Sequence, residues 1–313
     1  SASIGITIFP DDGTTPNDLL KNADSAMYAA KENGKANFQF YTPSLNTEIQ
    51  ERLAIKNGLI KAVEREEFDV FYQPKLNLHS GRIDSVEALM RWNSEELGSV
   101  SPAKFIPMLE ESGMVVDVGE WVLQKACKQH QSWLRAGLPP IRVAVNLSAR
   151  QLRELRFVGV VHEALSKSGV PAEGLEIEIT ESMLMSDSAV AVVALQELHD
   201  AGIHIAMDDF GTGYSSLSYL KRFPIDTIKI DRSFVSDITS NSDGTEIIRT
   251  IISMGRALNR RVVAEGVETK EQLDMLKSYQ CDEIQGFYFS RPLQSDEATK
   301  FLLDYFSKSE QKL

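Results

Sequence analysis

The chain is poor in cysteine and contains no long apolar run. Its two cysteines, Cys127 and Cys281, lie in apolar or mixed segments and show neither CxxC nor Cys–His spacing. This predicts buried free thiols in a reducing compartment and argues against both a disulfide framework and a zinc site. No apolar run approaches the roughly 20 residues that a membrane-spanning helix needs. We therefore expect a cytoplasmic location, while a membrane tether elsewhere in the parent protein stays open.

Positive charge is also scarce. The chain has 33 lysine and arginine residues against 45 aspartate and glutamate residues, which gives a formal charge of −12. Duplex DNA and other polyanions are bound through basic patches that contact phosphates. The charge balance therefore argues against a nucleic acid polymer as partner. It does not exclude a small anionic substrate that is held by metal ions.

The start of the chain has no secretory signal pattern, and Ser1 is an unusual first residue, so we expect a piece of a longer protein. Residues 1–45 contain the strand-like run SASIGITIF, a helical pattern over Asp18–Glu32 and a short strand over Asn37–Tyr41. Two strands and one helix are too few elements to bury a core. We predict that residues 1–45 are the tail of a truncated domain.

The remaining residues, 46–313, are predicted to form a second domain, and a hydrophobic fraction of 42% is enough for a sizeable core. The boundary is expected within Thr42–Asn46, followed by a charged amphipathic helix over Thr47–Glu67. From about residue 70, strand-like runs alternate with helical patterns whose apolar residues recur at three- and four-residue spacing. The predicted strands are Val70–Leu76, Ile83–Met90, Arg142–Leu147, Leu175–Thr180, His204–Asp208, Thr227–Ile230, Arg261–Ala264 and Glu283–Tyr288.

Eight strands that alternate with helices over roughly 250 residues match the size of a (β/α)8 barrel. A doubly wound open sheet is the competing architecture. Its dinucleotide-binding form is disfavoured, because no GxGxxG loop follows the first strand. We therefore predict an α/β chain made of a TIM-like barrel with a short α+β fragment in front.

Chemically active side chains end many of these strand-like runs, and most of them are carboxylates. In a (β/α)8 barrel the carboxyl ends of the strands meet at one mouth, where the chemistry gathers. Several carboxylates at that range resist joint ionisation unless cations neutralise them. The pattern therefore predicts a divalent-metal site made of oxygen ligands. The residues at or near these ends are Glu87, Asn146, Glu178, Asp208, Asp209, Lys229, Glu265 and Gln285.

Taken together, the motifs of residues 47 to the C-terminus resemble the EAL family of cyclic di-GMP phosphodiesterases. The signature stands as Glu87-Ala88-Leu89, and YQPK, FIPMLEESG, VNLS, EITE, DDFGTGYSSL, IKID, AEGVE and QGF occur in the family's order. Residues 1–41 resemble the last part of a GGDEF domain through SIGI and ADSAMYAAKENGKANF. The GGDEF motif itself is absent from this sequence, so we expect no cyclase activity of this chain.

The resemblance implies two Mg²⁺ or Mn²⁺ ions at the barrel mouth, and the choice between the two metals stays open. It places Glu87, Asn146, Glu178 and Asp208 on one ion, and Asp208, Asp209 and Glu265 on the other. Lys229 would orient or polarise the attacking water; the alternative is a salt-bridge partner of the acidic cluster with no catalytic part. Gln285 would support the site by hydrogen bonding.

Three further residues receive roles from the same resemblance. Arg91 would contact a phosphate of the substrate, although pairing with a barrel carboxylate is an alternative. Glu181 would anchor the loop after the fifth strand, and Glu268 would support the site as a neighbouring carboxylate; both roles are more structural than chemical. Gly211 and Gly213 give that loop backbone freedom to close.

The implied reaction is hydrolysis of cyclic di-GMP to linear pGpG in bacterial second-messenger signalling. Two metal ions suit it, because one acidifies water and the other clamps the leaving oxygen of the phosphodiester. The alternatives are a non-catalytic cyclic di-GMP receptor and a regulatory dimerisation module. The resemblance also implies a homodimer and a parent protein with further N-terminal sensory or GGDEF domains.

Overall fold

The computed structural model describes residues 2–32, 34–185, 189–213, 220, 222–238 and 242–310. The chain divides into two compact units. The first unit comprises Ser1–Phe68 and Trp92–Met108, and the second, called here the barrel unit, comprises Asp69–Arg91 and Leu109–Leu313. The division expected between residues 45 and 46 stays a prediction.

The first unit begins with a small sheet and two helices. Strands β1 (Ile4–Ile6) and β2 (Phe38–Phe40) pair in parallel, and α1 (Pro16–Glu32) connects them. Helix α2 (Pro43–Glu64) follows, with Pro43 in its first turn, where a missing backbone N–H costs nothing. The expected boundary segment therefore lies at the start of α2. This helix begins and ends earlier than the predicted range 47–67.

An aromatic cluster fills the other end of the first unit. Trp92 is fully buried, and its ring centroid lies 5.9 Å from that of Phe68 and 5.7 Å from that of Phe105. Gly58 of α2 leaves room for the indole, because a Cβ atom there would lie 3.1 Å from the Trp92 ring. Strand β5 (Gly98–Val100) and helix α3 (Pro102–Ser112) complete this part of the chain.

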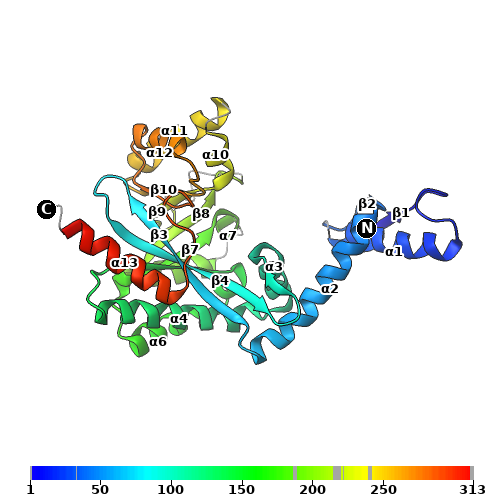
Figure 1. The fold of residues 1–313 in the computed structure, drawn as a ribbon, viewed down its shortest axis with the longest axis horizontal. Helices are drawn as coiled ribbons and strands as arrows, with labels where there is room; N and C mark the ends of the chain where they lie inside the picture. Colours follow the sequence, from blue (N-terminus) through cyan, green and yellow to red (C-terminus); the bar gives the residue numbers. More distant parts are fainter. Residues whose placement is uncertain are drawn as a thin grey trace. The chain divides into compact units, whose positions relative to one another are not determined.

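A closed sheet confirms the predicted barrel and excludes the open-sheet alternative. The hydrogen-bonded order is β3-β11-β10-β9-β8-β7-β6-β4, and β3 also pairs with β4, which closes the ring. Figure 1 shows β3, β4, β7, β8, β9 and β10 gathered in one part of the chain. The strands are β3 (Phe68–Asn77), β4 (Ile83–Ser94), β6 (Arg142–Asn146), β7 (Leu175–Thr180), β8 (His204–Phe210), β9 (Thr227–Ile230), β10 (Arg261–Ala264) and β11 (Glu283–Ile284).

The first barrel strand runs against the others, which departs from a simple (β/α)8 alternation. β3 pairs with β11 in antiparallel register, whereas β4, β6, β7, β8, β9, β10 and β11 are parallel neighbours. The reason is the length of the β3–β4 connection. Residues 78–82 form a short turn, and a parallel crossover needs a dozen or more residues.

The last strand is shorter than the predicted range 283–288. Its pairing ends at Ile284, because the chain then approaches the backbone after β10. A Cβ atom on Gly286 would lie 2.1 Å from the carbonyl oxygen of Val267, so only glycine permits this approach.

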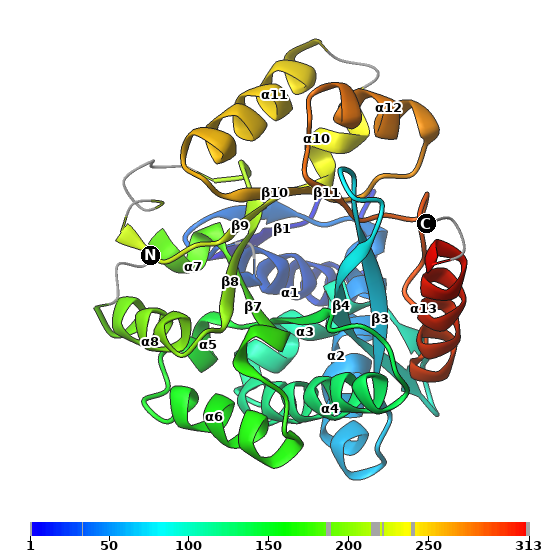
Figure 2. The same cartoon turned by 90° about the vertical axis from the view of Figure 1, so that its left-hand side faces the viewer.

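Helices form the outer layer of the barrel unit, as Figure 2 shows for α4, α6, α8, α11, α12 and α13 around the strands. Among the described residues, no helix combines the length and the hydropathy of a membrane span. The helices are α4 (Val115–Arg135), α5 (Ala149–Leu152), α6 (Phe157–Ser168), α7 (Glu181–Met185), α8 (Ala189–Asp200), α10 (Arg232–Asp237), α11 (Ser242–Ala257), α12 (Lys270–Ser278) and α13 (Ser295–Glu310).

The core lies between the strands and this helix layer. A substitution at Ile205 of β8 tests how much core packing contributes to the free energy of unfolding. Ile205 is fully buried in the main hydrophobic cluster. We expect Ile205→Ala to lower the free energy of unfolding by about 2–5 kcal/mol, because it leaves a cavity. Urea denaturation measures this. The control, Val193→Ala on α8, removes a residue that is 65% exposed and should change stability by less than about 0.5 kcal/mol.

Candidate metal centre at the barrel mouth

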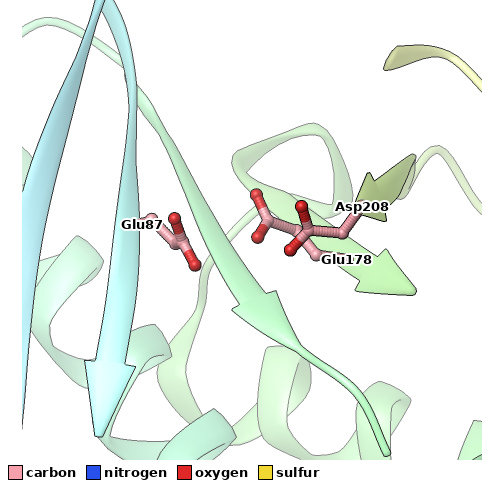
Figure 3. Close-up of side chains that lie close together, drawn as sticks. All are labelled: Glu87, Glu178 and Asp208. Carbon is pink, nitrogen blue, oxygen red and sulfur yellow. The ribbon is translucent and has the colours of Figure 1, made fainter. Parts of the chain in front are cut away.

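Three buried carboxylates converge at the carboxyl ends of the barrel strands. Glu87 comes from β4, Glu178 from β7 and Asp208 from β8, and Figure 3 shows their side chains pointing toward one another. Each offers an oxygen, and these oxygens lie within 4.8 Å of one another. Hard divalent cations prefer such oxygen donors. The three side chains therefore fit a Mg²⁺ or Mn²⁺ ion.

The ammonium of Lys229 lies inside this acidic cluster. Lys229 is fully buried on β9, and its Nζ is 2.6 Å from Glu178 Oε2 and 3.1 Å from Asp208 Oδ2. The same Nζ is 2.6 Å from Glu265 Oε1 and 3.5 Å from Glu87 Oε2. These contacts match the ion-pair alternative for Lys229. Its role in orienting water stays a prediction.

Two amides fix the position of Glu87. Asn146 Nδ2 donates to Glu87 Oε1 at 2.6 Å, and Gln285 Nε2 donates to Glu87 Oε2 at 2.6 Å. Gln285 also donates to Gln73 Oε1 at 3.0 Å, and Gln73 in turn donates to the Ser290 carbonyl at 2.9 Å. The structure thus brings Asn146 and Gln285 to the predicted site. Their two amide groups fix the two carboxylate oxygens of Glu87.

Backbone geometry separates the two adjacent aspartates. The β8–β9 register shifts between Met207 and Phe210, and Asp209 adopts a φ of +54°. This left-handed conformation is uncommon outside glycine, asparagine and aspartate. The Asp209 backbone N–H donates to Asp208 Oδ1 at 2.8 Å. The predicted strand ended at Asp208, whereas Asp209 still belongs to β8, and the irregularity redirects its backbone.

The acidic cluster has more negative charge than its ammonium groups compensate. Burial raises the pKa of Glu265 to about 8, with Asp208 and Glu87 adding to the rise and Lys229 opposing it. Burial, followed by the charge of Asp208, raises the pKa of Asp209 to about 6. Burial also opposes ionisation of Glu87, but Lys229 and Lys75 hold its pKa below the ordinary value. A cluster with unneutralised carboxylates is suited to binding cations.

The remaining predicted residues surround the cluster. Arg91 is half-buried, its Nη1 donates to the Met90 carbonyl at 2.9 Å, and its guanidinium lies 5.6 Å from the centre of the Phe71 ring. Its predicted phosphate contact stays a prediction. Glu268 is exposed, and its backbone N–H donates to Gln272 Oε1 at 2.7 Å. Its supporting role also stays a prediction.

Glu181 connects the cluster's strands to the loop after β8. It begins α7, and its Oε2 accepts a hydrogen bond from the Gly211 N–H at 3.1 Å. A Cβ atom on Gly213 would lie 3.4 Å from Glu181 Cδ, so both glycines of this loop lie against the carboxylate. The DDFGTGYSSL motif continues beyond residue 213 outside the described residues.

A cavity of about 240 Å³ opens beside the carboxylates. Sequence reasoning did not single out several of the polar and aromatic side chains in its wall, since isolated residues of these types carry no pattern. Gln73 belongs to the YQPK motif, which could have drawn attention to it. The lining residues are Gln73, Glu87, Leu89, Asp208, Arg232, Glu265, Gly266, Glu268, Gln285, Gly286 and Phe287.

Removing the Lys229 ammonium tests the charge balance. We expect Lys229→Met to lower the free energy of unfolding by about 3–5 kcal/mol in EDTA, because the neighbouring carboxylates lose their shared counter-charge. Mg²⁺ should restore part of this loss. Urea denaturation with and without Mg²⁺ measures both effects, with the exposed Lys277→Met as control. Wild-type stability of Lys229→Met in EDTA would contradict the arrangement.

Glu181 provides a second test. We expect Glu181→Ala to increase proteolytic cleavage near Gly211–Gly213 and to lower turnover, because the Gly211 N–H loses its acceptor. Limited proteolysis followed by mass spectrometry measures the first effect. Unchanged cleavage and unchanged rates together would show that Glu181 does not hold the loop.

Comparison with known proteins found relatives that match most of this chain. The bifunctional diguanylate cyclase/cyclic di-GMP phosphodiesterase MucR of Pseudomonas aeruginosa is 42% identical over 297 residues, which are 95% of this chain and 43% of that protein. The cyclic di-GMP phosphodiesterase PdeR of Escherichia coli is 37% identical over 309 residues, 99% of this chain and 46% of that protein. The chain therefore spans less than half the length of these curated relatives.

Two solved structures share the barrel. The PaMucR phosphodiesterase in complex with c-di-GMP has a TM-score of 0.76 and 40% identity, covering 78% of this chain and 99% of that chain. The FimX EAL domain from Pseudomonas aeruginosa bound to c-di-GMP has a TM-score of 0.70 and 26% identity, covering 78% and 96%. Residues 1–37 match the diguanylate cyclase, GGDEF domain family. The EAL domain family matches residues 56–292, and the chain belongs to it.

Proposed function

We propose that this barrel hydrolyses cyclic di-GMP to linear pGpG with two Mg²⁺ or Mn²⁺ ions. The observation that carries the proposal is the buried group of Glu87, Glu178 and Asp208 beside a cavity at the barrel mouth. Relatives named as cyclic di-GMP phosphodiesterases and a related structure in complex with c-di-GMP support the choice of substrate.

The donor set can be divided between two ions. Glu87, Asn146, Glu178 and Asp208 would hold the first, and Asp208, Asp209 and Glu265 the second. When bound, such ions supply a more acidic water and charge stabilisation for the leaving oxygen of a phosphodiester. Every donor is a carboxylate or an amide oxygen, which suits Mg²⁺ and Mn²⁺ equally.

Lys229 acts in this proposal as a cation and hydrogen-bond donor. Burial alone would lower its pKa, but Asp208 and Glu178 raise it well above the ordinary value. The surrounding carboxylates therefore favour the protonated, hydrogen-bond-donating form of the side chain. It can donate to a water oxygen and orient it, while its charge offsets that of the surrounding carboxylates.

Other side chains would position and receive the substrate. Asn146 and Gln285 hold the two oxygens of Glu87 in place. Arg232 lines the cavity, so its guanidinium is a candidate contact for a phosphodiester. Arg91 would supply a second phosphate contact.

Assembly and location belong to the same proposal. A parent protein with further N-terminal domains, a GGDEF domain among them, is supported by the match of residues 1–37 and by the length of the relatives. A homodimer is expected from the family, and a cytoplasmic location is expected from the buried free thiols Cys127 and Cys281.

The test is conversion of cyclic di-GMP to pGpG by the purified chain with Mg²⁺, with Mn²⁺ and with EDTA. Turnover that depends on metal and stops in EDTA is the expected result. Binding of cyclic di-GMP without turnover would overturn the proposed phosphodiesterase activity and favour a receptor function. Neither binding nor turnover would favour a regulatory module.

Asp208 gives the most direct variant. We expect Asp208→Asn to lower kcat roughly a hundredfold or more, because it removes the carboxylate assigned to both ions. Thermal unfolding should show that the barrel still folds. The control Glu197→Gln on α8 changes an exposed acidic residue and should keep wild-type turnover. Near-wild-type turnover by Asp208→Asn would sink the two-ion assignment.

A further inference from the structure

A second ammonium, from Lys75, lies fully buried inside the barrel, one layer below the mouth. Its Nζ is 2.6 Å from Glu178 Oε1 and 2.9 Å from Glu176 Oε1. Lys75 comes from β3, which runs against its neighbours, so residues later in β3 lie deeper in the barrel. Gln73 of the same strand reaches the mouth, and Lys75, two residues later, spans the layers of Glu178 and Glu176.

Burying a lysine in a barrel interior costs free energy unless its ammonium is paired with an anion. An isolated ammonium in a barrel interior would lose its hydration, a penalty of several kcal/mol. Burial alone would lower the pKa of Lys75, but Glu176 and Glu178 raise it above the ordinary value. Glu176 is in turn approached by Arg142 Nε at 3.6 Å. The Lys75 ammonium is therefore paired with two carboxylates, which fix its position between Glu176 and Glu178.

The two oxygens of Glu178 are held by different ammonium groups. Oε1 accepts from Lys75 and Oε2 from Lys229, both at 2.6 Å. Lys229 also contacts Glu87, Asp208 and Glu265, so a cation bound among these groups would compete with Lys229 for its partners. A cation bound at the mouth would not compete with Lys75 for Glu176, because Glu176 lies outside the group of Glu87, Glu178 and Asp208.

We propose that Lys75 is a positioning residue that holds Glu178 by one oxygen and presents the other to a divalent cation. The inference rests on the proposed function of the cluster as a metal site. It predicts that Lys75 sets the affinity of the site for the metal without touching substrate or metal. Groups that orient metal ligands in this way typically change metal affinity by about 10- to 100-fold when removed.

The test needs a variant that keeps the interior charge balanced. Lys75→Met alone leaves Glu176 and Glu178 without their counter-charge, which endangers folding. The double variant Lys75→Met/Glu176→Gln removes one positive and one negative charge together. Glu176→Gln alone is the matched control, because its amide oxygen can still accept from Lys75 and the Lys75–Glu178 contact remains.

Titration calorimetry of the full chain with Mn²⁺ alone, without substrate, measures the effect. We expect the double variant to bind Mn²⁺ about 10- to 100-fold more weakly than Glu176→Gln. Thermal unfolding in EDTA should show both variants folded. At saturating Mn²⁺, KM for cyclic di-GMP should change less than the metal requirement does.

The outcomes separate the two proposals. Equal Mn²⁺ affinity of the folded double variant and Glu176→Gln, with wild-type binding intact, would overturn the role of Lys75 alone. Absence of Mn²⁺ binding by the wild-type chain would overturn the proposed metal site and the role of Lys75 with it.

Discussion

The burial of like charges inside a closed barrel is the constraint on which the rest of this site depends. Glu87, Glu178, Asp208 and Glu265 all contact the ammonium of Lys229, and Glu178 also contacts that of Lys75. Removing each ion from water costs several kcal/mol, and these two cations, one of which also pairs with Glu176, leave the four carboxylates with an excess of negative charge. The raised pKa of Glu265 expresses the deficit. A divalent cation would remove the deficit, so the mutual repulsion of these carboxylates favours metal binding.

The antiparallel first strand, β3, supplies further partners to the buried carboxylates, from the mouth and from the layer below it. Because β3 runs antiparallel, it contributes Gln73 to the hydrogen-bond chain that ends on Glu87, and Lys75 to the ion pairs of Glu178. The other barrel strands bring carboxylates and amides to the mouth by their carboxyl ends. β3 thus supplies hydrogen bonds and a counter-charge to carboxylates on other strands, and the short β3–β4 turn makes this possible.

Sequence reasoning predicted the barrel and a group of side chains that the structure brings together at its mouth, because parallel strands place their carboxyl ends together. Glu87, Asn146, Glu178, Asp208, Lys229 and Gln285 follow from that rule alone. The rule does not give the direction of β3, which depends on the length of residues 78–82. Nor does it give the partners of Lys75, since a lysine in an apolar run carries no signal of which carboxylates it will meet. Pairing across distant strands is a property of the closed fold.

The central claim is that the carboxylates at the barrel mouth form a divalent-metal centre. A crystal structure of the chain with Mn²⁺, with anomalous scattering from the metal, tests it most directly. The account predicts one anomalous peak among Glu87, Asn146, Glu178 and Asp208, and a second among Asp208, Asp209 and Glu265, with Lys229 moved away from part of its present contacts. A cluster without any peak, and with Lys229 in its present contacts at saturating Mn²⁺, would contradict it.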